Sequence, residues 1–192
     1  MGLGEPSVLL IGTLDTKGPE VDYLRSRLHA LGVPTLVMDT GILGEPLFIE
    51  PDVSHADLAE FGGTTLEALQ QAGTRGRAVD QMRTFVRAKV ADLHRQGLVL
   101  GGIGLGGAEG AVMSAAALME LPLGVPKMVL SPIASGRHLF DPLVGTSDMI
   151  VMHTVVDILG LNAIACSVFD NAAAAMAGMV KHGQTALEAP EH

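Results

Sequence analysis

The chain has 192 residues, of which 48% are hydrophobic and 17% charged, and its formal net charge is −9. This composition is typical of one packed globular domain and excludes an intrinsically disordered chain. A net negative charge, the absence of Trp and an aromatic content of 3% disfavour binding to a phosphate backbone or to stacked bases, so we expect no nucleic-acid partner.

Three features lead us to expect a cytoplasmic protein without a membrane partner. Cys166 is the single cysteine, which excludes an internal disulfide and fits a reducing compartment. Residues 1–6 contain neither the basic region nor the apolar stretch of a secretory signal. No uninterrupted apolar run approaches the roughly 18 residues of a membrane span.

The first forty residues predict a βαβ unit. Residues 7–11 form a continuous apolar run, as expected of a strand buried on both faces. A polar turn at residues 12–18 precedes apolar residues at helical spacing from Val21 to Leu31, and residues 34–38 predict a second strand. In one sheet such a unit is parallel and right-handed.

The next segment predicts a long loop followed by helices. Ser54 and Asp57 have the spacing of a capping box, which predicts a short helix over residues 55–61. Another helical turn is expected at 65–71, and apolar residues three to four apart predict a long helix over 75–96. The basic residues of this long helix, interrupted by Asp80 and Asp92, are interpreted as a solvated face.

A glycine-rich segment at residues 101–110 follows the apolar run 98–100 and precedes a predicted helix at 111–119. A strand, a glycine turn and a helix in this order can hold phosphate, because the backbone approaches closely and the helix N-terminus offers free N–H groups. Glu109, however, places a negative charge where an anion would lie.

The remaining sequence completes an α/β pattern. Strands are expected at 127–130 and 149–152, separated by a loop, and a final helix at 163–181. The alanine run at 172–175 of that helix implies close packing on another backbone, within the chain or across a dimer. We therefore predict an open, doubly wound, mainly parallel sheet, a Rossmann- or flavodoxin-like three-layer sandwich. One domain would span residues 1–182, with a polar tail at 183–192.

Ligands of open α/β sheets bind outside the carboxyl ends of the strands, so the polar loops that follow the strands predict one shared site. Lys17 would pair with a phosphate, and Asp15 or Asp148 would hold Mg²⁺. The alternative is that these Thr and Asp residues only cap helices and that the glycines only permit close packing. The candidate binding residues are Thr13, Asp15, Thr16, Lys17, Asp39, Gly104, Gly106, Gly107, Ala108, Glu109, Gly110, Ser135, Gly136, Gly145, Thr146 and Asp148.

Other motifs are weak or absent. The Walker pattern is missing, and the near match to G-x-G-x-x-G at 102–107 lacks the acidic residue expected about 20 residues downstream. Ser135 has no nucleophile elbow around it, and the histidines lack metal-ligand spacing. No catalytic acid–base pair stands out, so the sequence leaves open whether the protein is an enzyme.

Six short segments together resemble the Tm-1-like ATP-binding domain family, also called UPF0261. The resemblance runs from about residue 7 to 181, with the motifs in matching order at 12–17, 104–107, 123–127, 134–136, 145–148 and 171–172. It implies an ATP-binding α/β protein, a homodimer or higher oligomer, with nucleotide contacts at 13–17, 104–110, Ser135 and Thr146. ATP, with Mg²⁺, is the cofactor that the resemblance implies.

Two departures from the family pattern affect this interpretation. The family usually follows Gly106 and Gly107 with small polar residues, whereas this chain has Ala108 and Glu109. The family also usually carries a second α/β domain, which a separate polypeptide would supply unless this chain is part of a longer protein.

Three hypotheses follow. The first is a nucleotide-binding domain that holds ATP or a related phosphate compound on the strand-end loops. The second is half of an enzyme acting on a small carboxylic or phosphorylated metabolite, with Glu109 as an acid or a metal ligand. The third is an oligomerising interaction subunit whose nucleotide site is vestigial.

Overall fold

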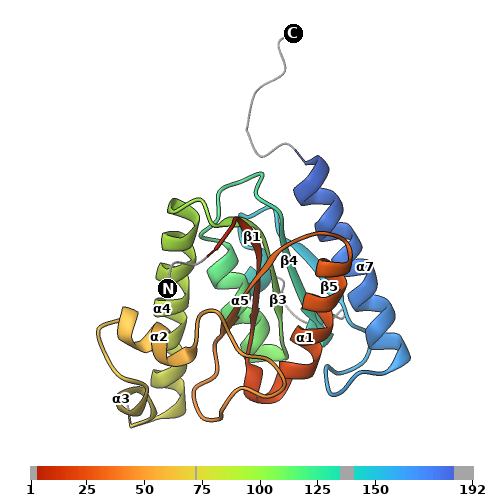
Figure 1. Cartoon of the computed structure of the whole chain (residues 1–192). Helices are drawn as coiled ribbons and strands as arrows, with labels where there is room; N and C mark the ends of the chain where they lie inside the picture. Colours follow the sequence, from red (N-terminus) through yellow and green to blue (C-terminus); the bar gives the residue numbers. More distant parts are fainter. Residues whose placement is uncertain (1–3, 72, 135–140, 184–192) are drawn as a thin grey trace.

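The computed structural model describes residues 4–71, 73–134 and 141–183 (Figure 1). Five strands form one sheet in which all neighbours are parallel, in the order β2-β1-β3-β4-β5. The strands are β1 (Ser7–Gly12), β2 (Thr35–Asp39), β3 (Val99–Leu105), β4 (Lys127–Ser131) and β5 (Ile150–His153). The predicted open parallel sheet is confirmed, with the strand order of flavodoxin-like proteins.

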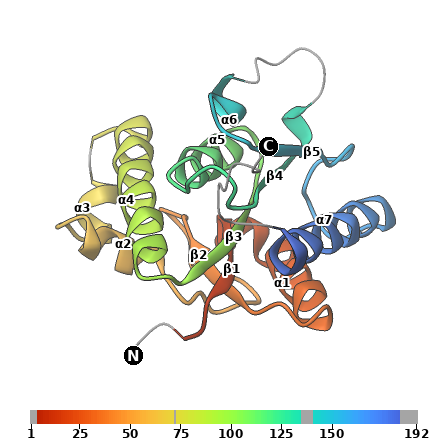
Figure 2. The same cartoon turned by 90° about the horizontal axis from the view of Figure 1, so that it is seen from above.

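Helices cover both faces of this sheet and make the three layers (Figure 2). On one face lie α1 (Leu14–Ala30) and α7 (Ala163–His182), and on the other α4 (Arg75–Arg95) and α5 (Ala108–Leu118). The short helices α2 (His55–Phe61) and α3 (Leu66–Gln70) pack on α4, and α6 (Asp141–Val144) packs on α5. A 3-10 turn, η1 (Pro132–Ala134), follows β4.

The burial of the central strand β1 explains why the continuous apolar run at residues 7–11 predicts a strand. All of its residues are buried, and they alternate between the two cores. Leu9 and Ile11 pack towards α4 and α5, whereas Val8 and Leu10 pack towards α1 and α7. A strand with a helix layer on each face has no polar side, which explains the absence of alternation in its sequence.

The predicted helix starts were placed too late at two positions. The segment expected as a polar turn at 12–18 is largely the first turn of α1, which begins at Leu14, and α5 begins at Ala108. The capping box predicted at Ser54 and Asp57 is confirmed, with Asp57 N–H donating to Ser54 Oγ and Ser54 N–H to the Asp57 carboxylate.

The glycine-rich segment is mostly strand, not turn. β3 runs through Gly101, Gly102 and Gly104 to Leu105. A Cβ on Gly104 would lie 2.2 Å from Ser114 Cβ, and one on Gly102 would lie 2.3 Å from Leu118 Cδ2. Glycine is needed at these positions because α5 lies directly against the strand. Only Gly106 and Gly107 remain at the turn itself, and Gly110 lies in the first turn of α5.

The loop at 145–148 lies at the opposite edge of the sheet from the one predicted. It precedes β5, and Met128 of β4 pairs with Ile150 of β5, so the loop meets the amino end of β4. There Asp148 Oδ1 accepts a hydrogen bond from Lys127 Nζ at 2.6 Å, and Lys127 also donates to two backbone carbonyls. The Lys127 side chain is completely buried, so this contact is an internal ion pair and belongs to the fold.

Half of the alanine run of α7 packs within the chain. Ala172 and Ala173 are buried, whereas Ala174 and Ala175 face outward, and the helix packs on α1 and β3. Among the described helices, α7 is also long and apolar enough to cross a membrane by length and composition, which differs from the expectation of no such segment. Core helices of globular proteins pass the same test, and 33% of the relevant window is buried here.

We expect Gly104→Ala to lower the free energy of unfolding by about 1–3 kcal/mol, because the added methyl overlaps the side chain of Ser114. Gly178→Ala is the matched control, since Gly178 lies in α7 with no atom near the added methyl, and it should stabilise by about 0.5–1 kcal/mol. Urea unfolding monitored by circular dichroism measures both. Equal effects of the two substitutions would contradict the packing role of Gly104.

We expect Asp148→Asn to destabilise the fold by about 2–3 kcal/mol, because it leaves the buried Lys127 ammonium without a countercharge. The effect falls below that of a fully buried pair since the Asp148 side chain is 41% exposed. Adding Lys127→Met to Asp148→Asn should recover much of the loss. If the double variant were less stable than the single one, the ion pair would not be the cause.

The same pair predicts a pH dependence. Burial alone would raise the pKa of Asp148, but hydrogen bonds from Lys127 and from the Gly124 N–H outweigh it and hold the pKa below its ordinary value. The contribution is therefore present above the unfolded pKa of about 3.9 and is lost as the pH falls through the lower folded value. Urea unfolding between pH 3 and 6 should show this acid loss in the wild type and a smaller one in Asp148→Asn.

Candidate functional site

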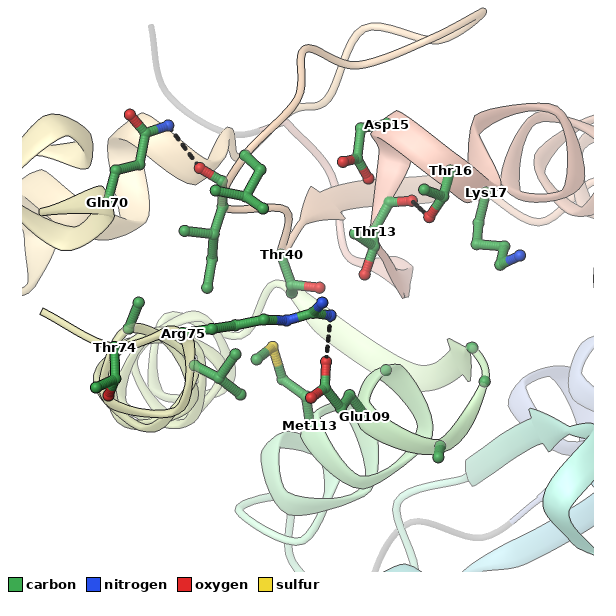
Figure 3. A pocket seen from close by; sticks show the side chains of 18 residues that line it. Thr13, Asp15, Thr16, Lys17, Thr40, Gln70, Thr74, Arg75, Glu109 and Met113 are labelled. Carbon is green, nitrogen blue, oxygen red and sulfur yellow. Dashed lines mark hydrogen bonds and ion pairs between the residues drawn. The ribbon is translucent and has the colours of Figure 1, made fainter. Parts of the chain in front are cut away.

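A cavity of about 560 Å³ opens at the carboxyl ends of β1, β2 and β3 (Figure 3). Its walls come from the first turns of α1, α4 and α5 and from the loop after β2. β1 and β3 are neighbours, yet their following helices lie on opposite faces of the sheet. This is the topological switch point at which open α/β sheets bind their ligands.

The structure brings together three of the predicted loops at this cavity, at residues 13–17, 39–41 and 104–110. Residues of the α1 start and of the α5 start face each other across it. The predicted residues that line the cavity are Thr13, Asp15, Thr16, Lys17, Gly106, Gly107, Ala108, Glu109 and Gly110.

The other predicted residues that the structure describes do not line it. Gly104 lies within β3, and Gly145, Thr146 and Asp148 lie at the amino edge of the sheet. The prediction failed for this loop because the spacing along the chain does not show whether a loop leads into or out of a strand. Ser135 and Gly136 lie outside the residues that the structure describes.

Lys17 does not have the role expected of it. Its Nζ donates a hydrogen bond to the carbonyl of Ile158, in the loop between β5 and α7, and Figure 3 shows the side chain pointing away from Arg75 and Glu109. One turn later on α1, Glu20 accepts from the Gly160 N–H at 2.7 Å. These two side chains attach α1 to the loop, and the Lys17 ammonium is already engaged.

Asp39 does not line the cavity, but its carboxylate binds backbone N–H groups next to it. Its side chain is fully buried, and Oδ1 accepts hydrogen bonds from the N–H groups of Leu14 at 3.0 Å and Gly41 at 2.9 Å. His55 Nδ1 lies 2.8 Å from Asp39 Oδ2, at ion-pair distance but outside hydrogen-bond geometry. Asp39 therefore fixes the start of α1 relative to β2.

Two helices that begin at the cavity, α1 and α5, lack a hydrogen bond from the side chain of their own N-cap residue. Thr13 and Gly107 occupy the N-cap positions of α1 and α5, and neither makes a side-chain capping bond. In contrast, α2, α3, α4 and α7 are capped by Ser54, Thr65, Thr74 and Asn162. The first N–H groups of a helix have no partner within the helix. In α1 the Leu14 N–H is bonded to the Asp39 carboxylate, so the N–H groups left at the cavity are mainly those of the first turn of α5.

Asp15 presents an unsatisfied carboxylate oxygen at this point. It lines the cavity, and its Oδ1 is buried without a hydrogen-bond partner among the described residues. The backbone of Gly44 lies so close that a Cβ there would be 2.8 Å from Asp15 Oδ2. The described residues contain no cluster of three or more acidic, histidine or cysteine side chains able to hold a metal unaided.

Sequence reasoning included the loop at residues 39–41 but missed the residues of the long helix, and Ile42 and Leu43 just beyond that loop. Arg75, assigned to a solvated face, lines the cavity, and its Nη2 lies 2.7 Å from Glu109 Oε2. Thr40 and Thr74 add hydroxyl groups. An apolar wall completes the cavity and comprises Ile42, Leu43, Ala78, Val79 and Met113. One signal was available: Arg75 opens α4, where the helix dipole favours an acidic residue.

Residues 6–185 match the model of the uncharacterised protein family UPF0261, N-terminal domain. A UPF0261 protein of Clostridium tetani is 35% identical over 174 residues, which are 91% of this chain and 42% of the relative. A UPF0261 protein of Brucella suis is 36% identical over 176 residues, which are 92% of this chain and 42% of the relative.

A plant protein is also similar. The ToMV resistance protein Tm-1(GCR237) of Solanum lycopersicum is 32% identical over 192 residues, which cover 91% of this chain and 25% of that protein. The chain thus spans less than half the length of these relatives. The family match over nearly all of the described residues shows that the chain belongs to the UPF0261 family and corresponds to its N-terminal domain.

Proposed function

We propose that this domain binds ATP or a related nucleotide in the cavity at the switch point between β1 and β3. The observation that carries the proposal is the convergence there of the starts of α1 and α5, of which α5 has no side-chain cap and α1 has its Leu14 N–H bonded to Asp39. Unpaired N–H groups and the positive ends of two dipoles favour an anion such as a phosphate. The volume of about 560 Å³ lies within the range of small-molecule sites.

The apolar wall supplies the second half of a nucleotide site. Ala78 and Val79 of α4 and Met113 of α5 line the cavity together with Ile42. A flat purine buries apolar surface well against aliphatic and thioether groups. The hydroxyls of Thr40 and Thr74 also line the cavity. Thr40 donates to the Gly12 carbonyl and Thr74 accepts from the Arg77 N–H, so Thr40 can still accept a hydrogen bond from a ribose and Thr74 can still donate one.

Mg²⁺ fits this arrangement as a companion of the phosphates. Two carboxylates, Asp15 and Glu109, line the cavity, so a polyphosphate would meet negative charge as well as N–H groups. Mg²⁺ is usually held by one or two carboxylates together with substrate phosphates and waters. Asp15, with its unpartnered Oδ1, has the chemistry to supply such a ligand.

A smaller phosphorylated or carboxylic metabolite is the second candidate. The helix N-termini recognise an anion and not a base, and Glu109 provides an exposed carboxylate beside the same place. This chain covers 42% of each bacterial relative. Any reaction, oligomer or second chain is therefore a proposal about the whole protein and not about this domain alone.

We expect isothermal titration calorimetry to detect binding of ATP, stronger with Mg²⁺ than with a chelator. Asp15→Asn should reduce the gain from Mg²⁺ by about tenfold, because it removes a charged metal ligand. Asp22→Asn is the matched control, since Asp22 lies on the same helix and pairs with Arg25 away from the cavity.

Parallel titrations with adenosine and with inorganic phosphate separate the two candidates. Binding of ATP together with adenosine supports a nucleotide site, whereas binding of phosphate without a contribution from adenosine supports a smaller anionic ligand. No binding of ATP at millimolar concentration by the folded protein would contradict the proposal.

A further inference from the structure

We propose that Glu109 acts as an internal anion that occupies the ligand's place and holds Arg75, so that an incoming phosphate must displace it. This inference concerns what sets the affinity and selectivity of the cavity, and it rests on the proposed function. The residues involved are one arginine from α4 and one glutamate from α5.

The contact spans the cavity between two helices. Arg75 Nη2 donates to Glu109 Oε2 at 2.7 Å, and the two residues are 34 positions apart in the chain. Both line the cavity, and Figure 3 shows the guanidinium lying over the Glu109 carboxylate beside Thr40. Their side chains are 75% and 60% exposed, so the pair is solvated and can exchange partners readily.

Arg75 is poorly placed for helix stability and well placed for an anion. It is the first residue of α4, where its charge opposes the helix dipole, and the first turn of α4 contains no acidic residue. The basic residues that suit the dipole, His94 and Arg95, lie in the last turn. Since the Lys17 ammonium is bonded to the carbonyl of Ile158, Arg75 is the cation that the described cavity lining leaves facing the ligand.

Glu109 occupies the complementary position. It lies in the first turn of α5, where the dipole and free N–H groups favour a negative charge, and this is also where a phosphate would bind. Its carboxylate therefore competes with a ligand anion for two attractions, the start of α5 and the Arg75 guanidinium. Guanidinium groups bind phosphate through paired hydrogen bonds, so phosphate can replace the carboxylate on Arg75.

The chain contains a matched pair for comparison. Arg87 Nε lies 2.7 Å from Glu120 Oε1, joining α4 to the turn that follows α5, at a place that does not line the cavity. Substitutions there remove an arginine–glutamate pair of α4 without touching the candidate site. General effects of charge and of helix packing are therefore separable from the effect at the cavity.

The test is calorimetric titration of the wild type and the variants Glu109→Gln, Arg75→Gln, Glu120→Gln and Arg87→Gln, at constant ionic strength. The probes are inorganic phosphate and ATP with Mg²⁺. Glu109→Gln should tighten phosphate binding by about fivefold, because it removes a competing charge and releases Arg75. Arg75→Gln should weaken binding by about tenfold, whereas Glu120→Gln and Arg87→Gln should leave it unchanged.

The outcomes distinguish this inference from the proposed function. Tighter phosphate binding by Glu109→Gln supports the inference even if ATP fails to bind, in which case the nucleotide proposal alone is overturned. Equal ATP affinity of the wild type and both cavity variants overturns the inference and leaves the nucleotide site standing. If no variant binds either probe, both fall. Thermal unfolding without ligand confirms that each variant is folded, and Glu109→Ala provides a second removal of the charge.

Discussion

The close approach of α5 to β3 is the packing constraint on which the cavity depends. Gly102 and Gly104 leave room for Leu118 and Ser114 of the helix, and at Gly106 an added Cβ would lie 2.8 Å from the backbone of Gly110. The helix can therefore begin immediately after the strand, with its N-terminus at the edge of the sheet. α4 packs on α5 in turn, and the space between their first turns and that of α1 becomes the cavity.

Backbone groups, more than basic side chains, give this cavity its character. Lys17 holds the β5–α7 loop, and Asp39 uses its carboxylate to fix the N–H groups of Leu14 and Gly41. With Lys17 engaged at Ile158, the charged side chains among the described residues that face the cavity are one cation, Arg75, and two carboxylates, Asp15 and Glu109. In such a site, affinity for an anion depends on which of these charges a ligand or a metal ion neutralises.

The two edges of the sheet have different roles. At the carboxyl edge, helix N-termini and hydroxyl groups remain available around a hollow. At the amino edge, Lys127 and Asp148 satisfy one another inside the protein, and Lys127 also bonds the carbonyls of Pro122 and Val125. A buried ammonium surrounded by acceptors stabilises one particular arrangement of β4 and the loop before β5. Polar residues at the two edges thus look alike in sequence but differ in what they do.

The sequence by itself determined the α/β class, the order of strands and helices, the Ser54 capping box and the family, because each depends on residues near one another in the chain. Only the tertiary structure decided which glycines serve packing, where Lys17 points and that Arg75 faces the cavity. The contacts responsible join residues far apart, such as Lys17 with Ile158 and Arg75 with Glu109, separated by 141 and 34 positions. Local spacing carries no information about such partners, nor about the edge of the sheet on which the Asp148 loop lies.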